Sequence, residues 1–293
     1  MSIFTGAGTA LVTPFNDKGV DFSAFETLIE YQIDGGIDAL IVCGTTGESS
    51  TMTKEEDMQA IDFVVKQAAG RVPVIAGTGS NNTQTAIETS KEAAGLGVDG
   101  LLVVTPYYNK CTDAGLIRHY FAIADAVRIP IIAYNVPGRT TVNISPLVMK
   151  EIGMHDNIAA VKEASANITQ IAETARVCPN IDIYSGNDDH VVPVLSLGGK
   201  GVISVVSNVA PHMTHEMVES YLSGDHARAL ELQFALNPLV KALFSEVNPI
   251  PVKKAMNMIG IKVGLPRMPL TEMSPDKAAL LENELRKLGF DLM

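Results

Sequence analysis

The sequence alternates short runs of aliphatic and β-branched residues with longer segments in which apolar residues recur every three or four positions. The short runs predict buried strands, and the longer segments predict amphipathic helices. The predicted strands are 8–13, 39–43, 72–76, 100–105, 129–134, 158–162, 181–185 and 201–206. The helical segments between them include 22–33, 54–68, 83–94, 114–127 and 168–177.

Strands that alternate with helices predict parallel βαβ units. Eight such units in about 220 residues fit a closed (β/α)8 barrel, the TIM barrel. A doubly wound open sheet is the alternative, and it normally carries a GxGxxG loop after a strand. The sequence has no such loop, and Gly6-Ala7-Gly8 is a lone GxG at the start of the first strand. We therefore predict an α/β fold of the (β/α)8 class.

The pattern changes after Ser223, where three helical segments follow one another without strands between them. These segments are 225–244, 249–259 and 275–288. Asp225 is a predicted N-cap, and Ser274-Pro275 places a capping residue before a proline at the first helical position. We predict a barrel catalytic domain over residues 1–224 and a C-terminal helical domain, a three-helix appendage, over residues 225–293.

The composition excludes several classes of protein. The chain of 293 residues is 46% hydrophobic and carries a formal net charge of −11, whereas nucleic-acid-binding surfaces are basic. No apolar run reaches the ~20 residues that a membrane helix needs, and residues 1–6 lack the features of a signal peptide. Cys43, Cys111 and Cys178 form neither a disulfide framework nor a metal-binding spacing. We expect a cytoplasmic protein.

Lys162 ends an apolar run, 158–161, which is a predicted buried strand. A lysine inside a buried strand costs free energy unless the site uses it. Low-dielectric surroundings favour the neutral, nucleophilic form of an amine, which can attack a carbonyl carbon and form a Schiff base. The alternative is a lysine at the sheet edge whose amine reaches solvent. Lys162 taken alone leaves both interpretations open.

Polar and reactive residues follow the predicted strands. In (β/α)8 barrels the chemistry lies at the carboxyl ends of the strands. The segments there are GTTGE at 44–48, GTG at 77–79, TPYYN at 105–109, YNVPGR at 134–139, Lys162, SGND at 185–188 and Ile203-Ser204. Together they supply an amine, phenols, hydroxyls and a guanidinium, a set that indicates carbonyl chemistry.

The sequence resembles the dihydrodipicolinate synthase family, within the superfamily of pyruvate-dependent Schiff-base class I aldolases, along nearly its whole length. The resemblance rests on GTTGE (44–48), TPYYN (105–109), YNVPGRT (134–140), VKEAS (161–165), GVISV (201–205) and NPIPVK (248–253). It implies a lyase that condenses pyruvate with L-aspartate 4-semialdehyde to give 4-hydroxy-tetrahydrodipicolinate. That reaction is the first committed step of diaminopimelate and lysine biosynthesis, and it needs no metal or organic cofactor.

The resemblance also implies roles for the catalytic side chains. Lys162 forms the imine with pyruvate, and Tyr134 shuttles protons. Thr45 passes the proton, hydrogen-bonded between Tyr134 and Tyr108. In the family, the tyrosine matching Tyr108 reaches across a subunit boundary. The family is commonly a homotetramer, a dimer of dimers, so we expect self-association.

Substrate-binding roles follow from the same resemblance. Thr46 holds the pyruvate carboxylate through its hydroxyl and backbone amide. Arg139 binds the carboxylate of aspartate semialdehyde, which suits a planar guanidinium that can grip a carboxylate with two hydrogen bonds. The backbone near Gly186 and Ile203 lines the pocket. The segment 248–251 precedes a predicted helix, and we interpret it as a helix entry rather than a ligand site.

Two other functions are weighed against the synthase. N-acetylneuraminate lyases and 2-keto-3-deoxy sugar-acid aldolases share the lysine and the tyrosine, but Arg139 and Thr46 favour the synthase. A non-catalytic barrel that binds a keto acid is the more remote alternative, and the intact set around Lys162 and Tyr134 argues against it.

Histidines after the last predicted strand raise the question of a metal site. His212, His215 and Glu216 have a spacing that can place ligands on one helix face. The first predicted strand, however, has no His-x-His pair, and we expect no metal.

The sequence also bears on regulation, because lysine-sensitive members of the family bind lysine at the tight dimer interface. The residues here that match that possible allosteric site are Ser49, Asn81 and Tyr107. Lys54, Asp57 and Thr85 occupy positions where such members often carry histidine or glutamate. Lys54 repels the ammonium of a lysine ligand, and Thr85 lacks a carboxylate to pair with it. We expect weak or absent inhibition by lysine.

Overall fold

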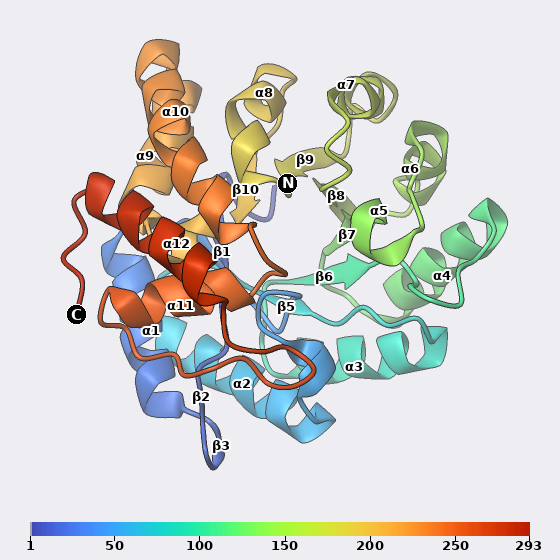
Figure 1. The fold of residues 1–293 in the computed structure, drawn as a ribbon. Helices are drawn as coiled ribbons and strands as arrows, with labels where there is room; N and C mark the ends of the chain where they lie inside the picture. Colours follow the sequence, from blue (N-terminus) through green and yellow to red (C-terminus); the bar gives the residue numbers. More distant parts are fainter. Residues whose placement is uncertain (1) are drawn as a thin grey trace.

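Eight parallel strands form a closed barrel in the computed structural model, which describes residues 2–293 (Figure 1). They are β1 (Gly6–Ala10), β4 (Ala39–Val42), β5 (Val74–Gly77), β6 (Gly100–Val104), β7 (Ile131–Asn135), β8 (Ile158–Glu163), β9 (Asp182–Ser185) and β10 (Gly201–Ser204). Each strand pairs with the next along the chain, and β10 pairs with β1 to close the barrel. The predicted (β/α)8 fold is confirmed, with the strand ends shifted by a few residues.

Helices surround the barrel and cover its outer face (Figure 1). They are α1 (Phe22–Asp34), α2 (Lys54–Ala68), α3 (Thr83–Gly95), α4 (Asp113–Ala126), α5 (Pro137–Thr140), α6 (Pro146–Ile152), α7 (Ile168–Val177), α8 (Val191–Ser196) and α9 (Pro211–Leu222). Side-chain caps fix the starts of several of them. Thr53 and Glu56, for example, form a complete capping box at the start of α2.

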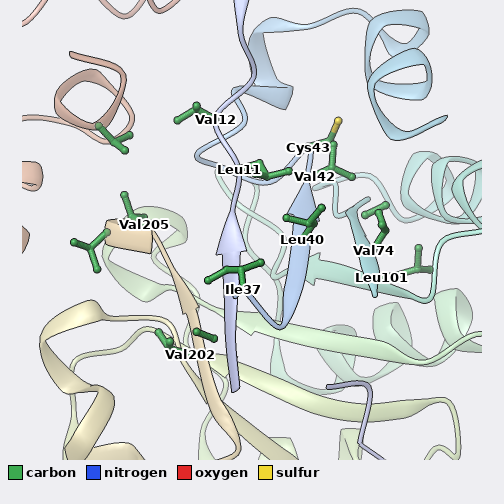
Figure 2. Close-up of a cluster of buried hydrophobic side chains, with 14 of the residues drawn as sticks. Leu11, Val12, Ile37, Leu40, Val42, Cys43, Val74, Leu101, Val202 and Val205 are labelled. Carbon is green, nitrogen blue, oxygen red and sulfur yellow. The ribbon is translucent and has the colours of Figure 1, made fainter. Parts of the chain in front are cut away.

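Successive strand residues face opposite sides of the barrel wall. On β4, Leu40 and Val42 belong to the core between strands and helices, whereas Ala39 and Ile41 belong to a second cluster inside the barrel. Figure 2 shows part of the outer cluster, in which Leu40 on β4 lies near Val74, its register partner on the neighbouring strand β5. The barrel interior is therefore filled by side chains rather than hollow.

A short antiparallel hairpin, β2 (Phe15–Asn16) and β3 (Gly19–Val20), was not predicted. Its strands of two residues are too short for an alternating pattern to be recognised. Gly6, in the lone GxG sequence, lies in β1 at φ 124°, and a Cβ there would lie 2.1 Å from Oδ2 of Asp38. This glycine is thus explained by backbone geometry and close packing.

The C-terminal part contains the three predicted helices, α10 (His226–Leu243), α11 (Ile250–Met258) and α12 (Pro275–Lys287). Asp225 caps α10 as predicted, by accepting a hydrogen bond from the backbone N–H of Arg228. Ser274 precedes α12 but makes no capping hydrogen bond, and its hydroxyl donates to Glu246 at 2.6 Å. None of the helices within residues 2–293 is both long and apolar enough to span a membrane.

A buried ion pair joins this C-terminal part to the loop that follows β4. Nζ of Lys253 lies 2.7 Å from Oε1 of Glu48, and both side chains are almost fully buried. The other carboxylate oxygen of Glu48 accepts a hydrogen bond from the backbone N–H of Arg267 at 2.8 Å. Burial lowers the pKa of Lys253, and the charge of Glu48 opposes that shift. Glu48 lies two residues after Thr46, so the pair fixes the loop that carries the predicted threonines.

Candidate active site

Lys162 and Tyr134 lie side by side near the carboxyl ends of β8 and β7. They are register partners in the parallel pair formed by these strands. Nζ of Lys162 lies 4.4 Å from the centroid of the Tyr134 ring, and both side chains are buried. A buried amine next to a phenol places a nucleophile beside a group that can donate or accept a proton.

A cavity of about 460 Å³ opens at this end of the barrel. Its wall includes Tyr134, Thr45 and Arg139 from the predicted site. Lys162 is not one of the described residues that line the cavity. Its amine lies over the ring of Tyr134, which does line it. The volume is ample for a small keto acid and a second small substrate.

The loop after β4 brings the two predicted threonines to the site in different environments. Thr45 is exposed and lines the cavity, whereas Thr46 is buried. Nδ2 of Asn248 donates a hydrogen bond to the Thr46 hydroxyl at 2.9 Å. This contact leaves the hydroxyl proton of Thr46 available for a second acceptor, such as a substrate carboxylate.

Arg139 lies on the short helix α5, and its guanidinium is exposed at the cavity wall. Its Nη2 donates to the backbone carbonyl of Asn248 at 3.2 Å. Asn248 therefore contacts both predicted substrate-binding side chains, Thr46 and Arg139. The interpretation of 248–251 as a helix entry alone misses this contact. The NPIPVK motif was the signal that could have revealed Asn248.

Asp188 is a buried acid just after β9, the strand beside β8. Its Oδ2 accepts hydrogen bonds from the backbone N–H groups of Val205 and Val206, at 3.0 Å each. Burial raises the pKa of Asp188, and these hydrogen bonds and the positive charge of Lys162 oppose the rise. Asp188 thus holds the chain just beyond β10 through these two backbone hydrogen bonds.

Two residues expected to line the pocket through their backbone lie at the ends of β9 and β10. The N–H of Gly186 donates to the carbonyl of Glu163 at 2.8 Å, and a Cβ at Gly186 would lie 2.7 Å from that of Ala164. Ile203 is fully buried in the cluster inside the barrel that also contains Tyr134.

Tyr108 is the one predicted catalytic residue that lies away from the others within one chain. Its side chain is 92% exposed. Within residues 2–293, no hydrogen bond links the hydroxyls of Thr45, Tyr108 and Tyr134. The predicted proton-passing chain is therefore not assembled by a single protomer.

Five of the six residues considered for regulation line the same cavity as Tyr134 and Arg139. Ser49, Lys54, Asp57, Thr85 and Tyr107 line it, whereas Asn81 lies outside its lining. The Ser49 hydroxyl donates to Asp57 at 3.0 Å, and Lys54 pairs with Glu92 at 2.7 Å.

The histidines considered as metal ligands contact other side chains instead. His215 lies 2.9 Å from Asp38, and Glu216 pairs with Arg228 at the same distance. His212 lies 4.0 Å from Glu216. Over residues 2–293, no group of three or more His, Cys, Asp or Glu residues could hold a metal ion.

A (β/α)8 barrel with a buried lysine at a strand end and a phenol beside its amine defines a class of enzymes that attack carbonyl substrates through that lysine. The model of the dihydrodipicolinate synthetase family matches residues 3–288. The chain belongs to this family.

Individual relatives are similar over their full length. The 4-hydroxy-tetrahydrodipicolinate synthase of Caldicellulosiruptor saccharolyticus is 56% identical over 293 residues, which cover 100% of this chain and 99% of the relative. The crystal structure of dihydrodipicolinate synthase from Aquifex aeolicus matches with a TM-score of 0.97 and 46% identity, over 99% of both chains. The enzyme from Cyanidioschyzon merolae, solved with lysine bound, matches with a TM-score of 0.96 and 40% identity, over 99% of this chain and 100% of that one.

Proposed function

We propose that this protein is a 4-hydroxy-tetrahydrodipicolinate synthase, which condenses pyruvate with L-aspartate 4-semialdehyde in diaminopimelate and lysine biosynthesis. The observation that carries the proposal is the buried Lys162 amine, 4.4 Å from the ring centroid of Tyr134. The Tyr134 ring in turn lines a cavity that Arg139 also lines. Family membership and full-length relatives with this name support it.

The chemistry begins at Lys162. Its neutral amine attacks the keto carbon of pyruvate, and the carbinolamine loses water to give the imine. Tyr134 supplies the proton that the departing hydroxyl needs, because its phenol lies beside the amine. The imine then loses a proton to form an enamine, whose carbon attacks the aldehyde. The amino group of the semialdehyde finally attacks the imine carbon, which closes the ring and releases Lys162.

The two substrate carboxylates need separate donors. Thr46 faces the pyruvate carboxylate with its hydroxyl and backbone N–H in our proposal, and Arg139 faces the semialdehyde carboxylate. A guanidinium that grips a carboxylate with two hydrogen bonds also orients the aldehyde for attack. Gly186 and Ile203 shape the pocket through their backbone.

Further proposals concern assembly and location. Tyr108 completes the proton path from Thr45 in a neighbouring copy of the chain, within a homotetramer built as a dimer of dimers. Its 92% exposure supports such a role, because a large aromatic residue at the surface is available to a partner. We propose a cytoplasmic location, which suits the free cysteines Cys43, Cys111 and Cys178.

Turnover with three aldehydes tests the proposed function. Pyruvate is offered together with aspartate semialdehyde, N-acetylmannosamine or glyceraldehyde. We expect turnover with aspartate semialdehyde alone and a loss on the order of 10³-fold or more in the Lys162→Ala variant, since the nucleophile is removed. Preference for a sugar aldehyde would assign the chain to the sugar-acid aldolases. Binding of pyruvate without turnover of any aldehyde would favour a keto-acid-binding barrel.

A further inference from the structure

Four polar side chains form a hydrogen-bonded network next to the catalytic strand ends. They are Asn135, Asn143, Glu163 and Gln170. Nδ2 of Asn135 donates to both carboxylate oxygens of Glu163, at 3.1 and 3.0 Å, and to Oδ1 of Asn143 at 3.0 Å. Asn143 and Gln170 exchange two amide hydrogen bonds, at 2.8 and 3.1 Å. Nε2 of Gln170 also reaches Glu163 at 3.4 Å.

The two inner members are direct chain neighbours of the proposed catalytic pair. Asn135 follows Tyr134 on β7, and Glu163 follows Lys162 on β8; Asn135 and Glu163 are register partners. Adjacent strand residues face opposite sides of a barrel wall, so the network binds the strands together from the side away from the amine. Asn135 is fully buried and Glu163 is 1% exposed.

The network also closes the loop that carries Arg139. Oδ1 of Asn135 accepts a hydrogen bond from the backbone N–H of Ile144 at 2.9 Å, and Nδ2 of the same side chain reaches Asn143. Residues 136–143, which contain Arg139, are thereby held at both ends by one asparagine.

The carboxylate of Glu163 is surrounded by hydrogen-bond donors. Asn135, Gln170 and the backbone N–H of Ser165 all donate to Glu163. Every described group hydrogen-bonded to the carboxyl is thus a donor, which suits its ionised form. Burial raises the pKa of Glu163, and the hydrogen bonds from Asn135, Ser165 and Gln170 oppose that rise. The carboxylate therefore determines which way each neighbouring amide is turned.

We propose that Asn135 and Glu163, with Asn143 and Gln170, are positioning residues that set the Lys162 amine, the Tyr134 phenol and Arg139 relative to one another. The inference rests on the proposed roles of these three residues. None of the four side chains needs to touch substrate. Their effect is geometric, because the rate of imine formation depends steeply on the placement of the reacting groups.

Glu163→Gln is the direct test. It replaces one acceptor oxygen with a donor that faces the amides of Asn135 and Gln170. We expect the rate at which borohydride traps the pyruvate imine to fall by roughly tenfold or more. We also expect KM for aspartate semialdehyde to rise, because the Arg139 loop loses its anchor. Glu151→Gln, the same change at an exposed glutamate on α6, is the matched control and should leave both values unchanged.

The exchange variant Asn135→Asp with Glu163→Gln distinguishes positioning from a general loss of stability. In this variant the new carboxylate at position 135 accepts a hydrogen bond from the new amide at position 163. The side-chain amides of Asn143 and Gln170 can both flip, so that their nitrogen and oxygen atoms change places and complementary contacts are restored. We expect the exchange variant to recover most of the trapping rate that Glu163→Gln or Asn135→Asp loses alone. Circular dichroism and thermal unfolding verify that each variant is folded.

Several outcomes would overturn the inference. A folded Glu163→Gln protein with the wild-type trapping rate and KM would do so, as would an exchange variant no faster than either single variant. If Glu163→Gln does not fold, Gln170→Ala at the half-buried end of the network replaces it, and an unchanged trapping rate there would have the same meaning. The proposed function fails separately, if the wild-type protein traps pyruvate but does not turn over aspartate semialdehyde.

Discussion

Asp57 is an acidic side chain in the cavity wall whose charge depends on pH. Burial raises its pKa to about 6. One of its carboxylate oxygens accepts the Ser49 hydroxyl, and Oδ1 has no hydrogen-bond partner among the described residues. Lys54, in the same wall, pairs with Glu92. The cavity wall therefore gains a negative charge at Asp57 as the pH rises through about 6, and it also carries the positive charge of Lys54.

These charges predict how the protein responds to lysine. We expect weak or absent inhibition at micromolar lysine, because Lys54 repels the ligand's ammonium and Thr85 offers no carboxylate. Any residual inhibition should strengthen as the pH rises through the Asp57 pKa of about 6, since the ionised carboxylate attracts the ammonium. Inhibition constants measured at pH values below and above 6 test both statements. Asp57→Asn should remove the pH dependence, and strong inhibition at micromolar lysine would contradict the expectation.

Among the elements, the C-terminal helices support the active site as well as packing on the barrel. Lys253 on α11 reaches Glu48 in the β4 loop, and Asn248, just before α11, contacts Thr46 and Arg139. The loop after β4 is therefore held by residues about 200 positions away in the sequence. The proposed division at residue 224 separates two parts that share one site.

The Glu48–Lys253 pair yields a stability prediction. Lys253→Met leaves the Glu48 carboxylate buried without its partner, and we expect a loss of about 3–5 kcal/mol in the free energy of unfolding. The double variant Glu48→Gln, Lys253→Met removes both charges and should recover much of that loss. Urea unfolding monitored by circular dichroism gives the order of the three proteins. A double variant less stable than Lys253→Met would show that the ion pair is not the cause.

For the molecule as a whole, Tyr108 connects the activity to assembly. It lies outside the cavity lining of its own chain, with φ at +66° in the left-handed region. Non-glycine residues adopt this region at some cost, and such strain is often found at functional positions. An exposed tyrosine held in that way suits a side chain presented to a second copy.

Mixed assemblies test this role. Lys162→Ala and Tyr108→Phe should each have little activity alone. When the two variants are co-expressed and pair within dimers, one site in each mixed dimer receives an intact Lys162 and an intact partner Tyr108. Random pairing should then restore about a quarter of the wild-type activity, since half of the dimers are mixed and each has one intact site. No recovery in verified mixed dimers would contradict a Tyr108 contribution from the partner.

Local patterns in the chain were enough to predict eight strands alternating with helices, because strand and helix periodicities depend on neighbouring residues. They also identified Lys162, since a lysine that ends an apolar strand conflicts with burial unless it is used. The helix cap at Asp225 followed from its local sequence. The positions of β2 and β3 did not, because strands of two residues carry too little pattern.

Contacts between distant residues became visible only in the folded chain. Pairing of β7 with β8 places Tyr134 and Lys162 in register, and packing of the C-terminal helices brings Asn248 to Thr46 and Lys253 to Glu48. Such contacts depend on the three-dimensional path of the chain, which local periodicity does not encode. The same holds for Glu163, because two of the donors to its carboxylate, Asn135 and Gln170, lie on another strand and on a helix.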